Sequence, residues 1–219
     1  MKTDLLAPQR CVICGRYACF DELPVCKYCL HIFNSIITEK CEKCGKSGLY
    51  CNCYKNDSIK YLFSYANEFF THGLVYYVKC YFDVRFMDFL VEQMFYTLGI
   101  DPKNYNAVTF VPRKPLRKRR YGVDQAEQLA RAIERRFGIP IIYTLERIGG
   151  RQQKTLPAKE RFLNIKGRYR LRSDIPNKKY NRILLVDDLC TTGATVKACA
   201  KLLRESISRE VGIIVIARK

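Results

Sequence analysis

The chain has 219 residues, of which 48% are hydrophobic and 27% charged, and its 39 Lys and Arg against 21 Asp and Glu give a formal net charge of +18. This composition excludes a disordered or fibrous protein, and the length allows one sizeable domain with a small appendage. No uncharged apolar run reaches about 18 residues, so no membrane-spanning helix is expected. The start of the chain, with a charge at Asp4, does not resemble a secretory signal, and we expect a cytoplasmic location.

Cysteines are concentrated at the start of the chain, where nine of the twelve fall within the first 53 residues. Eight of them form four close pairs, which are Cys11 and Cys14, Cys26 and Cys29, Cys41 and Cys44, and Cys51 and Cys53. In a cytosolic chain such pairs bind metal far more often than they form disulfides. We predict two structural zinc ions, one held by the first two pairs and one by the last two, and an interleaved pairing stays open.

A site of four thiolates leaves no coordination position for water, so these cysteines are not expected to be catalytic. Zinc would instead supply folding energy that so short a segment cannot obtain from a core. We therefore interpret residues 1–57 as a zinc-binding module that serves as a docking or nucleic-acid platform. Residues 58–219, which are richer in long aliphatic and aromatic segments, form the second predicted domain.

The second domain is predicted to alternate between strands and helices. Apolar spacing and turn residues predict, in chain order, a strand at Leu62–Tyr65, helices at Leu74–Cys80 and Phe86–Leu98, a strand at Ala107–Val111, a helix after Asp124, a strand at Ile139–Tyr143, a long loop over Arg147–Arg172 with an edge strand at its end, a strand at Ile183–Val186, a loop over Asp187–Thr195, a helix through Leu203 and a strand at Val211–Ala217. This order predicts an α/β domain with a mostly parallel sheet.

The most informative segment follows the predicted strand Ile183–Val186. Two carboxylates come first, and a loop rich in Thr and Gly then leads into a helix, so that amides, hydroxyls and the helix dipole form a nest for a phosphate. The carboxylates can hold the vicinal hydroxyls of a sugar or water on a magnesium ion. The candidate phosphate-binding residues are Asp187, Asp188, Thr191, Thr192, Gly193, Ala194 and Thr195, of which Asp187 and Asp188 are also the candidate catalytic residues. A plain helix-capping loop is the alternative, and neither GxxxxGK[ST] nor GxGxxG occurs.

This segment resembles the signature with which type I phosphoribosyltransferases bind 5-phosphoribosyl-1-pyrophosphate (PRPP). Further stretches resemble the ComF family, and they are Val111–Arg113, the arginine-rich run after it, Tyr121–Ala126 with Leu129 and Ala130, and the series Arg147, Gln152 or Gln153, Leu156, Arg161, Asn164 and Gly167. The cysteine pairs match the zinc-binding head of that family, so the resemblance covers nearly the whole chain. Two departures are Arg113, where a small or apolar residue is expected, and Tyr121–Asp124 in place of Arg-Gly-Phe-Asn.

The resemblance implies a phosphoribosyltransferase-type fold that binds PRPP with magnesium and acts in natural competence on incoming single-stranded DNA. By position, Arg113 and Lys114 follow the first core strand, where this fold usually holds the pyrophosphate. Proteins of the DNA-uptake machinery at the inner face of the membrane are the implied partners, and they would bring the cytoplasmic chain to the membrane periphery.

Positive charge is dense in two segments. Residues 113–136 carry nine Lys and Arg against three acids, and residues 147–172 carry nine against one. Such segments suit phosphate contacts, with Tyr121, Phe162 and Tyr169 available for base stacking. The candidate DNA-binding residues are Arg117, Lys118, Arg119, Arg120, Tyr121, Arg147, Arg151, Lys154, Arg161 and Arg168. A merely solvated face, an acidic membrane surface or an acidic protein partner would give the same composition.

Three functions are consistent with these features. The first is a DNA-uptake accessory protein that binds single-stranded DNA and a PRPP-like ligand. The second is an active phosphoribosyltransferase on an unidentified acceptor, in which Asp187 and Asp188 stabilise the ribose while basic residues receive pyrophosphate. The third is a zinc-dependent scaffold with a vestigial pocket. The absence of a recognisable set of residues for an acceptor base favours the first.

Overall fold

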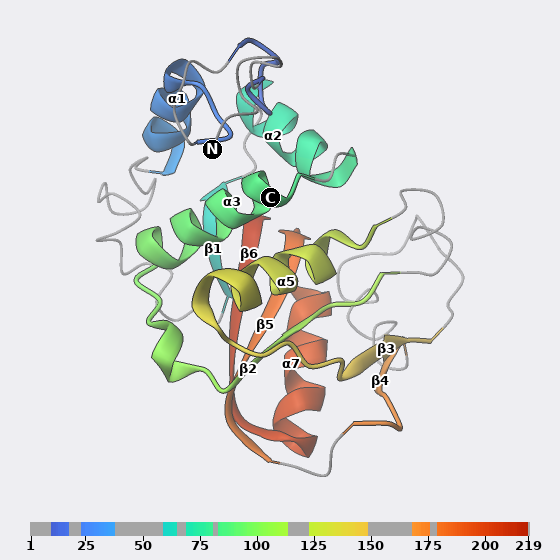
Figure 1. Cartoon of the computed structure of the whole chain (residues 1–219). Helices are drawn as coiled ribbons and strands as arrows, with labels where there is room; N and C mark the ends of the chain where they lie inside the picture. The colour runs from blue at the N-terminus through green and yellow to red at the C-terminus, as the bar shows by residue number, and fades with distance from the viewer. Residues whose placement is uncertain are drawn as a thin grey trace, which may run out of the picture.

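A computed structural model describes residues 10–17, 23–37, 59–64, 69–80, 83–113, 123–148, 168–175 and 179–218 (Figure 1). Its elements, in chain order, are α1 (Lys27–Ile37), β1 (Ile59–Ser64), α2 (Phe69–Cys80), α3 (Val84–Thr97), the short 3-10 helix η1 (Pro102–Asn104), β2 (Ala107–Phe110), α5 (Gln125–Phe137), β3 (Leu145–Arg147), β4 (Tyr169–Leu171), β5 (Tyr180–Cys190), α7 (Ala194–Ser206) and β6 (Ser208–Arg218).

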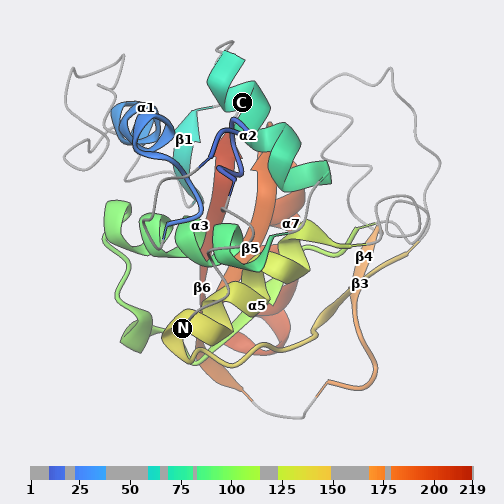
Figure 2. The same ribbon diagram turned by 45° about the horizontal axis from the view of Figure 1, so that its top comes forward.

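The centre of the molecule is a four-stranded, fully parallel sheet in the order β1-β6-β5-β2, which confirms the predicted sheet type. Helices α3 and α5 cover one face, and α7 covers the other (Figures 1 and 2). Each face has its own buried cluster of apolar side chains. We call these clusters the α5-side core, with Phe86, Leu90, Leu129, Ile133, Leu184 and Val186, and the α7-side core, with Ile183, Leu185, Val196, Cys199, Leu203 and Val215.

Strand β5 is longer than its neighbour β2, and this difference creates an open edge. The pairing between β2 and β5 ends at Phe110 and Val186, whereas β6 continues to pair with β5 as far as Cys190 and Arg218. Asp187–Cys190 are therefore held by a ladder on one side only. In a parallel sheet, ligands bind outside the carboxyl ends of the strands, and this is such an end.

Two predicted segments differ from the structure in the type of element. Asp187–Cys190 belong to strand β5 and not to a loop, because β6 supplies hydrogen-bonding partners for these polar residues. The predicted strand Ile139–Tyr143 is reduced to a single parallel bridge between Ile141 and Val108. The bridge has two hydrogen bonds, from the Val108 N–H to the Pro140 carbonyl and from the Ile142 N–H to the Val108 carbonyl, and Pro140 has no N–H with which to extend the ladder.

The predicted edge strand at the end of the long basic segment is β4, which pairs in antiparallel fashion with β3 at the beginning of that segment. The two strands form a separate ribbon beside the main sheet (Figure 1). Residues 149–167, which connect β3 to β4, lie outside the described residues.

The cysteine-rich segment contacts the α/β domain directly. The ring of Phe33 in α1 lies 5.3 Å from the ring of Phe89 in α3. Cys11, Cys29 and Phe33 all belong to the α5-side core. The two predicted domains therefore share buried surface, while the boundary near residue 57 lies outside the described residues and stays a prediction.

Candidate ligand and metal sites

The first candidate site is formed by the two carboxylates at the open end of β5. Asp188 is buried and Asp187 partly buried, and the N–H of Asp188 donates to Asp187 Oδ1 at 2.9 Å. Successive side chains of a strand point to opposite faces of a sheet. Accordingly, Asp188 contacts Arg113 after β2, whereas Asp187 lies near groups of the α7-side core.

Asp188 forms an ion pair with Arg113. The backbone N–H of Arg113 also donates to Asp124 Oδ2 at 3.0 Å, while Asp124 Oδ1 accepts from the N–H of Ala126 and caps helix α5. Burial raises the pKa of Asp124, although these N–H donors oppose the shift. One network thus joins the ends of β2 and β5 to the start of α5. The sequence indicated the capping role of Asp124 but not its contact with Arg113.

Burial and the adjacent carboxylate outweigh the positive charge of Arg113 at Asp187. Burial, and next the negative charge of Asp188, raise the pKa of Asp187 well above its ordinary value. Burial also raises the pKa of Tyr169 to about 12, and Asp187 contributes to this increase. A carboxylate in this state gains from a bound cation or from hydroxyl donors, which makes it a candidate ligand contact.

The loop after β5 ends in a glycine that no other residue could replace without strain. Gly193 has a φ of +75°, and a Cβ atom at this position would lie 2.6 Å from Ile59 Cδ1. The first hydrogen bond of α7 runs from the Lys197 N–H to the Gly193 carbonyl at 2.9 Å. The preceding N–H groups at the start of α7 therefore have no partner inside the helix. That of Ala194 donates to Thr192 Oγ1 at 3.4 Å, and those of Thr195 and Val196 are available to an anion. Thr191 and Thr192 are exposed beside them.

The second candidate site is a cluster of four cysteines. The sulfur atoms of Cys11, Cys14, Cys26 and Cys29 all lie within 4.8 Å of one another. A tetrahedral zinc ion with Zn–S distances of 2.3 Å requires sulfurs about 3.8 Å apart. Cys14 Sγ and Cys26 Sγ lie 3.8 Å apart, so the geometry fits a metal ion such as zinc.

These thiols have unequal acidities. Burial opposes ionisation of Cys11, yet backbone N–H groups, foremost that of Cys26, lower the pKa of its thiol to about 7. In contrast, burial and the neighbouring thiol of Cys14 raise the pKa of Cys29. Four thiolates at this spacing would need a cation, and a metal ion would supply it.

The structure brings together the four cysteines assigned to the first predicted zinc site. Cys41, Cys44, Cys51 and Cys53, assigned to the second, lie outside the described residues. His31 is exposed on α1 and is not part of the cluster.

Few of the predicted DNA contacts fall on described residues. Arg147 and Arg168 do, whereas Arg117, Lys118, Arg119, Arg120, Tyr121, Arg151, Lys154 and Arg161 do not, and neither does Lys114 of the predicted pyrophosphate site. Tyr169 cannot serve as an open stacking platform, because it is only 6% exposed. Its position in β4, packed on the α7-side core, explains the difference.

Sequence reasoning also missed Gln125 at the start of α5. Gln125 is 3% exposed, and its Nε2 donates to the Lys79 carbonyl at the end of α2 at 2.7 Å. Its Oε1 is buried and has no hydrogen-bond partner among the described residues. The signal that could have identified this residue is the match of Gln125 and Ala126 to the motif quoted above.

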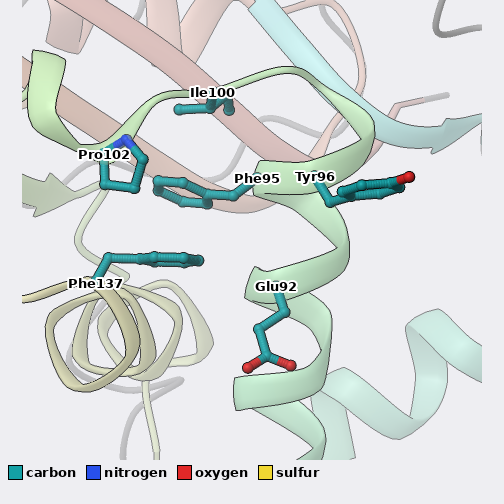
Figure 3. Close-up of a pocket in the computed structure, with 6 residues that line it drawn as sticks. All are labelled: Glu92, Phe95, Tyr96, Ile100, Pro102 and Phe137. Atoms are coloured by element: carbon teal, nitrogen blue, oxygen red, sulfur yellow. The ribbon is translucent and has the colours of Figure 1, made fainter.

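A third feature is an apolar hollow that lies away from both sites. It has a volume of about 280 Å³ and is lined by Glu92, Phe95, Tyr96, Ile100, Pro102 and Phe137 (Figure 3). The stacked rings of Phe95 and Phe137, 4.0 Å apart, join the ends of α3 and α5. The hollow contains none of the candidate ligand residues.

Comparison with known proteins connects these features to two groups. The phosphoribosyl transferase domain matches residues 111–219. Competence protein ComFC of Streptococcus pneumoniae is 29% identical over 206 residues, which cover 87% of this chain and 86% of that protein. Competence protein F of Haemophilus influenzae is 33% identical over 114 residues, 51% of this chain, and the aligned part spans only half the length of that protein.

Solved structures give weaker likenesses. The allosteric regulatory enzyme of purine biosynthesis aligns with 59% of this chain and 24% of its own at 18% identity and a TM-score of 0.39. Orotate phosphoribosyltransferase from Aeropyrum pernix aligns with 61% of this chain and 70% of its own at 17% identity and a TM-score of 0.35. The fold assignment therefore depends on the domain match and the sheet order. Among the described residues, no helix combines the length and apolar character that a membrane crossing needs.

Proposed function

The chain belongs to the ComF family of phosphoribosyltransferase-like proteins, and we propose that it is an accessory protein of natural DNA uptake that binds single-stranded DNA and a PRPP-like phosphoribosyl ligand. The single observation that carries the ligand assignment is the open end of β5. There Asp187 and Asp188 extend beyond β2, and a turn at Gly193 leads into the first amides of α7.

In this proposal the 5-phosphate of the ligand lies against the first N–H groups of α7 and the hydroxyls of Thr191, Thr192 and Thr195. The ribose hydroxyls lie against Asp187 and Asp188. Both carboxylates also suit magnesium, which prefers oxygen ligands and is the cation expected with PRPP. The raised pKa of Asp187 supports this arrangement, because hydroxyl donors and a cation would relieve the crowding of negative charge.

Asp188 and a bound pyrophosphate group would compete for the guanidinium of Arg113. The Arg113 guanidinium forms an ion pair with Asp188. A pyrophosphate group bound after β2 would compete for the same guanidinium, in keeping with the predicted role of Arg113 and Lys114. Ligand binding would then free Asp188 to contact the ribose or magnesium. Arg113→Lys should keep the charge but weaken pyrophosphate-containing ligands more than ribose 5-phosphate, because lysine lacks the planar fork of donors.

The DNA part of the proposal depends on the two basic segments and on the family. We expect affinity for an oligothymidylate to fall with salt, with a log–log slope of about −0.7 for each phosphate contacted. Alanine at Arg117, Lys118, Arg119 and Arg120 should make this slope shallower without changing sequence preference. A matched control removes four positive charges elsewhere, at Lys103, Lys201, Arg204 and Arg209. Binding that does not depend on salt would refute this part.

An active phosphoribosyltransferase is the second candidate function. The observation that favours it is the pair of carboxylates beside an arginine, which is suited to a positively charged ribose and a departing pyrophosphate. Release of pyrophosphate from PRPP with a purine or pyrimidine acceptor, abolished by Asp187→Ala, would establish it. Absence of release, with PRPP still bound, would leave the ligand-binding accessory role.

A further inference from the structure

The outer surface of the four-cysteine cluster carries two pairs of arginine and tyrosine. The Arg10 guanidinium carbon lies 4.8 Å from the ring centroid of Tyr17, and that of Arg16 lies 5.9 Å from the ring centroid of Tyr28. Both tyrosines are open to solvent, with exposed fractions of 58% and 63%. We call Arg10, Arg16, Tyr17 and Tyr28 the Arg–Tyr surface.

The cysteine cluster itself determines where these four residues lie. Arg10 directly precedes Cys11, and Tyr28 directly precedes Cys29. The backbone between them is tied back on itself, because the Cys11 N–H donates to the Arg16 carbonyl at 2.7 Å and Arg10 forms an antiparallel bridge with Tyr17. Arg16 and Tyr17 are consecutive, so the two pairs are adjacent. Loss of the cluster would disperse them.

Among the described residues, no carboxylate pairs with the two arginines of this surface. Neither Arg10 nor Arg16 forms an ion pair within the part of the chain that the structure describes, and segments 10–17 and 23–37 contain no Asp or Glu. The α/β domain differs, because eight of its described arginines pair with a carboxylate. They are Arg85, Arg113, Arg131, Arg135, Arg136, Arg170, Arg172 and Arg182.

We propose that the Arg–Tyr surface binds single-stranded nucleic acid, with bases stacked on Tyr17 and Tyr28 and phosphates contacted by Arg10 and Arg16. This inference depends on the proposed single-strand binding and adds a binding surface outside the basic segments 113–136 and 147–172. Exposed rings that already carry guanidinium groups offer both stacking and phosphate contact. An acidic membrane or an acidic protein would need the positive charge but not the open ring faces.

The test uses the full-length, zinc-loaded chain and a fluorescent oligothymidylate followed by anisotropy. The double variant Tyr17→Ala and Tyr28→Ala should bind more weakly by a factor on the order of ten or more, because two base-stacking contacts are lost. The salt slope should change little, because neither substitution removes a positive charge. Phenylalanine at both positions should restore binding. Arg10→Ala with Arg16→Ala should instead make the slope shallower by about 1.4, or about 0.7 for each contact.

Matched controls come from the α/β domain. Tyr96 is more exposed than either tyrosine, and Arg209 is an exposed arginine at the start of β6, so Tyr96→Ala and Arg209→Ala should leave binding unchanged. Bound zinc, measured for each variant, reports whether the module is folded. Removal of the metal from the unmodified chain should weaken binding at least as much as the double tyrosine variant does.

Two results would overturn the inference. One is an unchanged affinity in the double tyrosine variant. The other is an effect of that variant on binding to phosphatidylglycerol vesicles but not to the oligonucleotide, which would assign the surface to membranes. In either case the four-alanine variant at residues 117–120 distinguishes failure of the Arg–Tyr surface from failure of the proposed single-strand binding. If that variant loses DNA binding, the proposed function stands without this surface, and if the unmodified chain does not bind DNA at all, both fail.

Discussion

The cysteine module and the α/β domain differ in how their positive charge is used. In the α/β domain most described arginines are paired with carboxylates, often between elements, as in Arg135 with Asp88 and Arg113 with Asp188. In the module, Arg10 and Arg16 lie over tyrosine rings instead. A formal charge of +18 therefore does not by itself locate an anion-binding surface. Among the described residues, arginines without a carboxylate partner are the more informative signal, and Arg10 and Arg16 direct attention to the module.

The two regions also differ in what holds them together. The α/β domain has a buried cluster on each face of its sheet, whereas the described part of the module is held by four clustered cysteines and by one side of α1. The module is nevertheless not isolated, since Phe33 packs against Phe89 within the α5-side core. Its metal and its contact with α3 should therefore both contribute to stability, and the predictions below separate these contributions.

The largest effect is expected from loss of the metal. Structural zinc contributes about 10–16 kcal/mol of apparent binding energy in zinc-finger peptides. Cys11→Ser should release zinc and open amide exchange over residues 10–37, while β5 and β6 stay protected. Elemental analysis measures the bound zinc, and amide hydrogen exchange measures the protection of each segment. Cys199→Ala, a buried cysteine outside the cluster, should leave the zinc content unchanged. Equal loss of protection in β5 and β6 of Cys11→Ser would mean that the regions do not fold separately.

The contact between the regions comes next. Phe33→Ala should reduce the free energy of unfolding by about 3–5 kcal/mol, because a fully buried ring is removed from the α5-side core. It should also increase exchange in both α1 and α3. Leu203→Ala, in the α7-side core, should cost about 2–5 kcal/mol and leave exchange in α1 unchanged. A cost below about 1 kcal/mol for Phe33→Ala would show that the module does not share the core.

A smaller effect is expected at the turn before α7. Gly193→Ala should cost about 1–3 kcal/mol, because alanine is strained at a φ of +75° and its Cβ would meet Ile59. Gly73, in α2, has open space around its Cα, so Gly73→Ala should instead stabilise the chain by up to about 1 kcal/mol. Urea unfolding compares the two. Similar stability of both variants would contradict the described turn.

The smallest effect is expected at Asp187, where a substitution should increase the free energy of unfolding and not decrease it. A raised pKa in the folded state means that stability is greatest below the ordinary carboxyl pKa and decreases as the pH rises through the raised value. Asp187→Asn should remove this decrease and gain about 0.5–2 kcal/mol at pH 7, as expected where function is kept at the cost of stability. Unfolding at several pH values tests this. A lower stability at pH 7 would contradict it.

The sequence predicted best what depends on neighbours in the chain. The first zinc cluster follows from two CxxC pairs, and the turn at Gly193 follows from the residues around it. Contacts between distant segments were not predictable in the same way. Arg113 and Asp188 are 75 positions apart. Nothing in the sequence around either residue indicates that Arg113, predicted to bind pyrophosphate, would form an ion pair with Asp188, predicted to bind ribose.

The errors in the strands have the same origin. Ile183–Val186 is the apolar part of β5, but the strand continues through Asp187–Cys190 because β6 pairs with it. The basic surroundings of Tyr169 predict a residue available for stacking, whereas the pairing of β4 with β3 places it in the α7-side core. In each case a partner strand decided the outcome, and that partner cannot be identified from the segment alone.

Binding of a phosphoribosyl ligand at the open end of β5 can be measured by titration calorimetry with PRPP and magnesium. The unmodified chain should bind one equivalent, and the double variant Asp187→Ala and Asp188→Ala should bind at least tenfold more weakly while it keeps its fold. A control double variant, Asp101→Ala and Asp174→Ala, removes two exposed carboxylates and should bind like the unmodified chain. If the Asp187 and Asp188 variant binds PRPP as tightly as the unmodified chain, the site assignment is wrong.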